Sequence, residues 1–365
     1  MTANHRALCF VLGTTLPGAA PRAGQAQSAA VDSYIKAEME QQHIPGLSLV
    51  VARDGKIVKQ TSYGLASIEF SAPATNATLY QIASATKSFT ATAVMMLVEE
   101  GKFRTTDSIT KLLPGLPEKW NAVTVRQLLS HTSGLPDLLA RAGYGPLRWR
   151  TRKEALDSLP LEPMAGTPGG QWAYNQTNYL LLQDLVEKYC GESLPKFIQQ
   201  RIFDPLGMKL TVYDSRTVVP HYATHYEYKD GKLLRVINDA AIYPWLFSAA
   251  GIGTTAEELY RFAEGLRTNK LLKPLSTEEM WTPPVRNDGK TIIEAGPFRL
   301  EYGYGFVVDR TRDKRSMGHS GGGNAAFRIF PDDRMVVVVL HNGQTPIPDQ
   351  LVFGVASKYN PKLTF

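Results

Sequence analysis

Strand patterns at the two ends of the sequence enclose a long stretch of helical patterns, and this order restricts the folds available to the chain. Residues 46–64 alternate apolar and polar side chains on both sides of Asp54-Gly55, a pair that tolerates the positive φ angles of a tight hairpin turn. Three more strands are predicted near the C-terminus, over residues 302–309, 327–330 and 335–341, with a turn at Pro331-Asp332-Asp333 before the last. We therefore expect one antiparallel sheet built from both ends of the chain.

Between these strands the apolar residues recur at helical spacing. Gly101 is placed to end the first predicted helix, and Thr255 with Glu258 fits a capping box at the start of the last. Residues 222–236 are an exception, because their alternation around Asp230-Gly231 predicts a small hairpin. The expected fold class is α+β, an antiparallel sheet flanked by helices with a mostly helical insertion. The predicted helices cover residues 88–100, 124–130, 178–189 and 255–266.

The composition indicates a globular chain with a sizeable core. Of 365 residues, 43% are hydrophobic and 20% are charged, which argues against disorder, and two cysteines are too few for a disulfide scaffold. The net charge of +6 comes from scattered basic residues, so no nucleic-acid partner and no membrane-surface patch are indicated. The longest apolar run, residues 335–340, has the length of a strand, and no membrane span is expected.

The first residues have the layout of a secretory signal. Arg6 precedes an apolar segment, and small residues then lead to Gly24-Gln25-Ala26. We expect residues 1–26 to be a signal peptide and the mature protein to be periplasmic or secreted, with a disordered tail as the alternative. Cleavage would remove Cys9 and leave Cys190 alone, and a single thiol forms neither an internal disulfide nor a cysteine-based zinc site.

Four Ser-x-x-Lys pairs occur, and one of them lies where catalysis is plausible. Ser84 stands where the helix of residues 88–100 would begin, so Ser84 and Lys87 would share one face of its first turn. A partly desolvated lysine at the positive end of a helix loses its proton more readily and can activate a serine hydroxyl. In the other pairs we expect a serine with a capping or surface role beside a solvated lysine: Ser33/Lys36, Ser108/Lys111 and Ser193/Lys196.

Two further clusters could line a cleft. Residues 169–179 join a Gly/Pro-rich turn to a helix and contain Tyr174, and residues 318–324 lie between predicted strands. The second cluster also fits G-x-S-x-G, the nucleophile elbow of an α/β-hydrolase, with Ser320 as nucleophile. An elbow requires a strand before the serine and a helix after it, whereas a strand-turn-strand pattern follows here, so this alternative is disfavoured.

Three motifs in this order resemble the signatures of the serine β-lactamase and penicillin-binding-protein superfamily: Ser84-Ala-Thr-Lys87, Tyr174-Asn-Gln176 and His319-Ser-Gly321. The similar branch contains class C β-lactamases, D-alanyl-D-alanine carboxypeptidases, D-aminopeptidases and β-lactamase-like carboxylesterases. Residues 128–135 and 248–251 add to the resemblance, which covers about residues 31–358.

The resemblance implies the β-lactamase/transpeptidase-like fold. A sheet subdomain would combine residues 31–85 and 290–358, and a mostly helical subdomain would span 86–289, with the active site between them. The first motif would open a buried helix, the second would lie in the helical part, and the third would line an edge strand of the sheet.

The resemblance also implies a role for each site residue. Ser84 would attack a carbonyl and become acylated, Lys87 would help to accept its proton, and Tyr174 would relay the proton and later activate water. The backbone N–H groups of Ser84 and Gly322 would hold the oxyanion. The substrate would contact the remaining motif residues, Gln176, His319, Ser320 and Gly321.

Two departures from the family pattern bear on the substrate. Gln176 stands where the second motif usually has asparagine, so the amide is kept but reaches one methylene further. His319 stands where most β-lactamases have lysine, and histidine is only partly cationic near neutral pH, which weakens carboxylate binding. The resemblance therefore favours esterases and peptidases over β-lactamases.

Other histidines are expected to have no catalytic or metal role. His131 follows a predicted helix end among small polar residues, where a bond to backbone groups is expected. His221 and His225 are four residues apart in a strand-like segment and lack a third ligand.

The leading hypothesis is a serine hydrolase that forms an acyl-enzyme at Ser84 on an ester or amide, of the carboxylesterase or D-amino-acid peptidase type. The alternatives are a β-lactamase and a penicillin-binding protein that acylates with little turnover. The substrate would be a small molecule or a peptide, no cofactor or metal is needed, and the sequence leaves the oligomeric state open.

Overall fold

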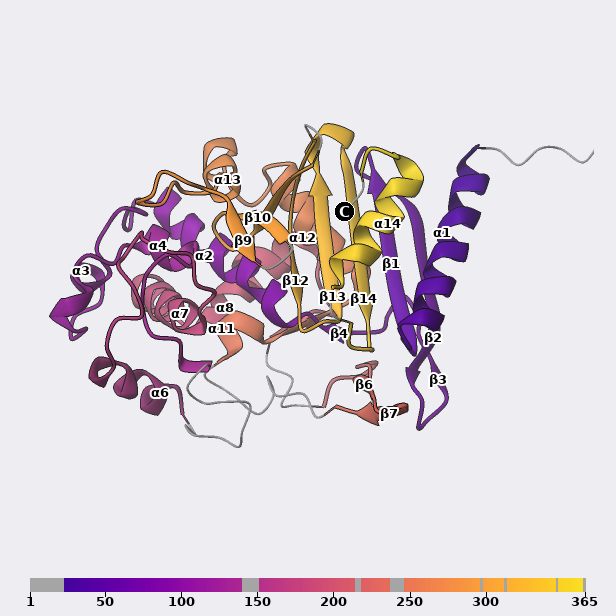
Figure 1. The fold of residues 1–365 in the computed structure, drawn as a ribbon, viewed down its shortest axis with the longest axis horizontal. Helices are drawn as coiled ribbons and strands as arrows, with labels where there is room; N and C mark the ends of the chain where they lie inside the picture. Colours follow the sequence, from indigo (N-terminus) through magenta and orange to yellow (C-terminus); the bar gives the residue numbers. More distant parts are fainter. Residues whose placement is uncertain are drawn as a thin grey trace, which may run out of the picture.

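A computed structural model of the protein describes residues 23–139, 151–213, 218–236, 246–295, 298–311, 314–345 and 347–363. Within these residues the central element is a nine-stranded sheet in the order β3-β2-β1-β14-β13-β12-β11-β10-β9, with antiparallel pairing throughout. Helices cover the sheet, and a helical region lies beside it (Figure 1). Its strands are β1 (Gly46–Arg53), β2 (Lys56–Ser67), β3 (Ala72–Pro73), β9 (Ile293–Ala295), β10 (Phe298–Tyr302), β11 (Val307–Thr311), β12 (Lys314–Gly321), β13 (Ala325–Phe330) and β14 (Met335–His341).

The two ends of the chain meet in this sheet, as the sequence predicts. β1 pairs with β14 from Leu47 opposite His341 to Arg53 opposite Met335. β1 and β2 form the predicted hairpin, and Asp54 and Gly55 at its turn have φ angles of 51° and 75°. The α+β fold class is thereby confirmed.

Two layers of helix explain why the run at residues 335–340 is apolar throughout. Val337 and Val339 pack with the helices α1 (Ala23–Gln41) and α14 (Asp349–Tyr359), whereas Val336 and Val338 belong to the core on the opposite face. Successive side chains of a strand point to opposite faces, so a strand covered on both sides needs apolar residues at every position.

The opposite face of the sheet is covered by α12 (Ala256–Arg267), which packs on β1, β13 and β14. Beyond it lies α2 (Thr86–Glu99), whose residues 86–97 are all buried. The remaining helices are α3 (Ile109–Leu112), α4 (Val125–Leu129), α6 (Arg152–Ser158), α7 (Gln176–Cys190), α8 (Leu194–Ile198), α9 (Asp204–Leu206), α11 (Phe247–Ala250) and α13 (Pro274–Trp281). The described residues also form two small sheets, one of β4 (Tyr80–Gln81), β8 (Ile252–Thr254) and β5 (Val212–Tyr213), the other of β6 (Tyr226–Lys229) and β7 (Lys232–Arg235).

The predicted helices and the second hairpin are confirmed as α2, α4, α7, α12 and β6-β7. One predicted detail of α12 is wrong, because only one of the two hydrogen bonds of the expected capping box forms. The Thr255 side chain accepts a hydrogen bond from the N–H of Glu258, but the Glu258 carboxylate accepts hydrogen bonds from Leu210 N and Thr211 Oγ1 instead. This acid therefore anchors a neighbouring loop to the helix.

The C-terminal strands also differ from expectation. The predicted strand 302–309 is interrupted at residues 303–306, which separate β10 from β11. Residues 314–321 form a strand, β12, which lies between β11 and β13 and is not an edge of the sheet. α12 lies within residues 86–289, the range predicted for the helical subdomain, and packs on the sheet. The subdomain division itself stays a prediction.

The expected signal peptide lies almost wholly outside the described residues, and Ala23 already begins α1. No helix within the described ranges is long and apolar enough to cross a membrane.

Candidate active site

Ser84 lies on a tight turn at the entrance to a buried helix. The 3₁₀ turn Ala83–Ala85 runs directly into α2, so Lys87 falls in the first turn of α2. Ala83 has a φ of 40°, in the left-handed region that residues with a Cβ seldom adopt. Lys87 Nζ lies 3.3 Å from Ser84 Oγ, within hydrogen-bonding distance. The other Ser-x-x-Lys serines lack this setting, because Ser108 and Ser193 precede short helices and Ser33 lies on α1.

The Lys87 side chain is fully buried and is held by a backbone group. Its Nζ donates to the carbonyl oxygen of Ala249 at 3.2 Å. Burial lowers the pKa of Lys87 to about 7, and the negative charge of Asp137 opposes this shift. Lys87 can therefore lose its proton near neutral pH while still donating to Ala249 and facing Ser84.

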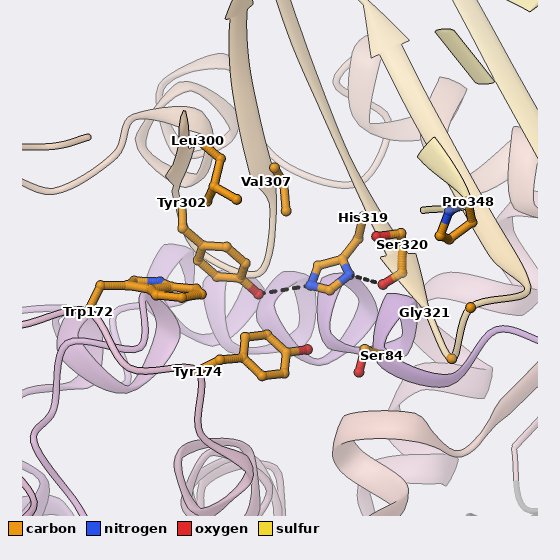
Figure 2. A pocket seen from close by; sticks show the side chains of 12 residues that line it. Ser84, Trp172, Tyr174, Leu300, Tyr302, Val307, His319, Ser320, Gly321 and Pro348 are labelled. Atoms are coloured by element: carbon orange, nitrogen blue, oxygen red, sulfur yellow. Dashed lines mark hydrogen bonds between the residues drawn. The ribbon is translucent and has the colours of Figure 1, made fainter. Parts of the chain in front are cut away.

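Tyr174 stands just before α7 and presents its hydroxyl to the same place. Figure 2 shows this hydroxyl directed toward Ser84. The oxygen is buried and has no hydrogen-bond partner among the described residues. Burial raises the pKa of Tyr174, while the Ser84 side chain acts in the opposite direction. Tyr174 therefore stays a neutral phenol with its proton available to a bound molecule.

The segment around Tyr174 is fixed by His131 and Asp137. His131 Nδ1 accepts a hydrogen bond from the backbone N–H of Asn175 at 3.1 Å, so the expected bond to a backbone group is confirmed. Asp137 Oδ1 accepts one from the N–H of Gln176, the first residue of α7, at 2.9 Å. Both loops thus hold the start of α7 and set the direction of Tyr174.

β12 approaches the Ser84 turn so closely that glycine is required. A Cβ on Gly321 would lie 2.1 Å from the carbonyl oxygen of Ile82 and 2.7 Å from the backbone nitrogen of Ser84. Gly322 and Gly323 follow with φ angles of 59° and 74°. This close approach brings the backbone at residues 321–322 beside that of Ser84, as an oxyanion hole requires.

His319 projects from β12 into the site and is bonded through both ring nitrogens. Nδ1 lies 2.5 Å from the carbonyl oxygen of Ser320, and Nε2 lies 3.0 Å from the hydroxyl of Tyr302 (Figure 2). Burial, reinforced by the charge of Lys87, lowers the pKa of His319 to about 3. His319 is therefore a neutral imidazole at physiological pH.

These residues enclose a cavity of about 300 Å³. From the predicted set, Ser84, Tyr174 and residues 319–322 line it. The sequence analysis gave no role to the apolar wall, although Trp172 belongs to the cluster of residues 169–179 and Tyr302 begins a predicted strand. The wall consists of Trp172, Leu300, Tyr302, Val307 and Pro348.

Gln176 lies outside that lining. Its side chain is buried, and its Oε1 has no hydrogen-bond partner among the described residues. Its contact with the site runs through its backbone N–H and Asp137. As for metals, no cluster of three or more His, Cys, Asp or Glu suited to a metal occurs within the described ranges.

The fold and this pocket define the chain as a β-lactamase/transpeptidase-like protein. Over residues 31–352 the sequence matches the Beta-lactamase family, and the chain belongs to that family. It is 31% identical over 319 residues to penicillin-binding protein 4* of Bacillus subtilis, covering 81% of this chain and 67% of that protein. The chain spans 64% of the length of other curated relatives.

Solved structures share the fold. EstCE1, a hydrolase with promiscuous acyltransferase activity, superposes with a TM-score of 0.80 at 21% identity, covering 92% of this chain and 99% of that one. The D-amino acid amidase from Ochrobactrum anthropi SV3 gives a TM-score of 0.75 at 23% identity, covering 93% and 97%.

Proposed function

We propose that this protein is a serine hydrolase that cleaves an ester or amide through an acyl-enzyme on Ser84, of the carboxylesterase or D-amino-acid peptidase type. The observation that carries the proposal is the pairing of Ser84 with a buried Lys87 whose pKa is lowered to about 7. A hydroxyl beside a neutral amine in an apolar pocket is the arrangement that nucleophilic catalysis by serine needs.

Acylation follows from the contacts of Lys87. The neutral amine accepts the proton of Ser84 Oγ, which attacks the substrate carbonyl and forms a tetrahedral oxyanion. The backbone N–H groups of Ser84 and Gly322 are proposed to bind this oxyanion, each contributing about 3 kcal/mol to the transition state. The close approach of β12 to the Ser84 turn supports that assignment.

Tyr174 supplies the path for the proton. Its phenol donates to the leaving alkoxide or amine and recovers a proton from Lys87, so the carbon–oxygen or carbon–nitrogen bond breaks and acyl-Ser84 remains. Water then attacks the ester with the same groups acting in reverse, which releases the acid and frees Ser84. The buried, protonated hydroxyl of Tyr174, which faces the Ser84 side chain, supports this role.

A penicillin-binding protein that acylates with little turnover is the second candidate. The observation in its favour is the 31% identity to penicillin-binding protein 4* of Bacillus subtilis. In that case the acyl-enzyme would accumulate because water is poorly activated, and the fate of the adduct separates the two candidates.

Two measurements on the mature protein test the proposal. Released nitrophenol reports turnover of 4-nitrophenyl acetate, and intact-mass spectrometry reports covalent adducts formed with this ester and, separately, with benzylpenicillin. Wild type is expected to release nitrophenol over many turnovers, whereas Ser84→Ala retains its fold by circular dichroism and loses at least about 1,000-fold in rate. Turnover that survives in Ser84→Ala would contradict the nucleophile. A stable penicillin adduct without released product would favour the second candidate.

Export remains a prediction from the N-terminal sequence. We propose that the protein acts in the periplasm or outside the cell after removal of residues 1–26. N-terminal sequencing of the protein recovered from its native host, with Gln27 as the expected first residue, would test this.

A further inference from the structure

The lining of the Ser84 cavity contains no formal charge. None of the 12 described residues that form it is Asp, Glu, Lys or Arg. Lys87 lies behind Ser84, where its Nζ is engaged by Ser84 and Ala249. A carboxylate placed against this lining would lose part of its water and meet no lysine or arginine side chain there in return, which is costly.

The one lining group that could become cationic, His319, is neutral because it is buried, and its contacts fix which ring nitrogen carries the proton. The carbonyl oxygen of Ser320 can only accept, so Nδ1 carries the ring proton. Nε2 then has a lone pair and accepts the hydroxyl proton of Tyr302. Protonation of Nε2 would require Tyr302 to turn its proton toward Tyr179, the other hydroxyl that it contacts, within a site that already buries the imidazole.

Tyr302 is itself held firmly. It is 3% exposed, and its ring packs against those of Trp172, His131 and His319 at centroid distances of 5.9, 5.1 and 5.8 Å. These aromatic neighbours leave the hydroxyl directed at His319, as Figure 2 shows. The hydrogen bond is therefore a fixed part of the pocket wall.

We propose that this pocket selects esters or amides without a carboxylate beside the scissile carbonyl, and that Tyr302 enforces the selection by bonding His319 Nε2. Tyr302 acts as a positioning residue that keeps the imidazole an uncharged wall. This inference rests on the proposed serine hydrolase function and specifies its substrate class.

Paired substrates test the selection on either side of the reacting carbonyl. Mono-4-nitrophenyl adipate and its methyl ester differ by one charge in the acyl group, and 4-acetoxybenzoate and its methyl ester differ by one charge in the leaving group. Wild type is expected to favour each methyl ester by about 100-fold in kcat/KM, the penalty for burying an unpaired charge. Subtraction of the rate with Ser84→Ala removes spontaneous hydrolysis.

Tyr302→Phe tests the mechanism of selection. The negative charge of a bound carboxylate favours the imidazolium, and without the phenol Nε2 can take a proton and pair with that carboxylate, so the preference is expected to fall about tenfold at pH 6 and less at pH 8. The fraction of enzyme with a neutral Lys87 limits both members of a pair alike. The charge of Lys87 acts on the carboxylate alone, so each Tyr302→Phe ratio is compared with the wild-type ratio at the same pH. His319→Lys is expected to lower the preference at both pH values.

Tyr304→Phe is the matched control. This substitution also removes a tyrosine hydroxyl, two residues from Tyr302 in the sequence. The Tyr304 hydroxyl donates to Glu279 at 3.4 Å, and Tyr304 does not line the cavity. The preference of Tyr304→Phe for the methyl esters over the carboxylates should equal that of wild type.

Each outcome decides the inference. Hydrolysis of the carboxylates within threefold of their methyl esters overturns the selection while leaving the proposed function intact. An unchanged preference in Tyr302→Phe overturns the role of Tyr302. No Ser84-dependent hydrolysis of any of the four substrates would overturn the proposed function and this inference together.

Discussion

The protonation state of Lys87 governs whether Ser84 can be activated. Burial lowers its pKa to about 7, and the charge of Asp137 acts in the opposite direction. Because only the neutral amine can accept the proton of Ser84, the active fraction of the enzyme should rise with pH through that value. Asp137 is half-buried and already bonds the N–H of Gln176, so it acts on Lys87 from a fixed position.

Asp137→Asn should make this effect measurable. The amide keeps an acceptor for Gln176 N–H but removes the charge that raises the pKa of Lys87, so the acid limb of the kcat/KM profile should move to lower pH. Profiles with a neutral ester from pH 5 to 9 would show the shift. Asp157→Asn is the control, because Asp157 is an exposed partner of Lys153 on α6. A limb that stays at the wild-type pH would mean that Asp137 does not act on Lys87.

The residues of the site differ in whether a short stretch of sequence is enough to identify them. Ser84 and Lys87 could be singled out because a three-residue spacing at a helix start is a local pattern. Tyr302 could not, because its contact with His319 joins β10 to β12, two strands that are separated in the sheet by β11. Gln176 is expected to contact the substrate, and this stays a prediction; its side chain lies outside the cavity lining, and its backbone N–H is held by Asp137.

At the level of elements, the site depends on how closely β12 lies against the Ser84 turn. Gly321 is the point of contact, since any Cβ there would overlap the carbonyl oxygen of Ile82. The turn also carries the positive φ of Ala83. A strand and a strained turn thus hold each other in the geometry that a tetrahedral intermediate needs.

Gly321→Ala is expected to lower kcat by about 100-fold or more, because the new methyl group must push β12 or the turn out of position. Steady-state kinetics beside a thermal melt would separate this loss from unfolding. Gly166→Ala is the control, since a Cβ there meets its nearest neighbour at 3.9 Å and its φ is ordinary. Full activity in Gly321→Ala would show that the contact is dispensable.

Helices and strands with a short-range sequence pattern could be predicted, whereas β12, which has no such pattern, could not. The β1-β2 hairpin has alternation and Asp54-Gly55, and α2 has periodic apolar residues with Gly101 at its end. β12 has neither, because Lys314 to Ser316 is polar and glycines interrupt the rest. It becomes a strand only through pairing with β11 and β13.

Across the whole molecule, buried histidines tie stability to pH. Burial lowers the pKa of His131, His225, His319 and His341, the last two to about 3. In the unfolded chain a histidine takes up a proton near pH 6.5, whereas the folded protein resists until about pH 3. The unfolded state therefore binds more protons in this interval, and stability falls as the pH drops from 6.5 toward 3.

His341→Leu should weaken the pH dependence of the unfolding free energy, and His341 does not line the Ser84 cavity. His341 is fully buried at the end of β14, and its loss should reduce the fall in unfolding free energy by on the order of 1 kcal/mol per pH unit between pH 6 and 4. Urea titrations at several pH values measure the slope. His221→Leu is a surface control, and an equal slope in both variants would contradict the assignment.

The pairing of β1 with β14 has a consequence for synthesis of the protein. β1 acquires its second neighbour only after about 280 further residues have been synthesised, which takes on the order of tens of seconds at about 5–20 residues per second. Until then one edge of β1 is unpaired, and the glycines of β12 that complete the Ser84 site have not yet been made. A nascent chain is therefore inactive almost to its last strand, and any translation arrest before β14 leaves an exposed edge that chaperones must cover.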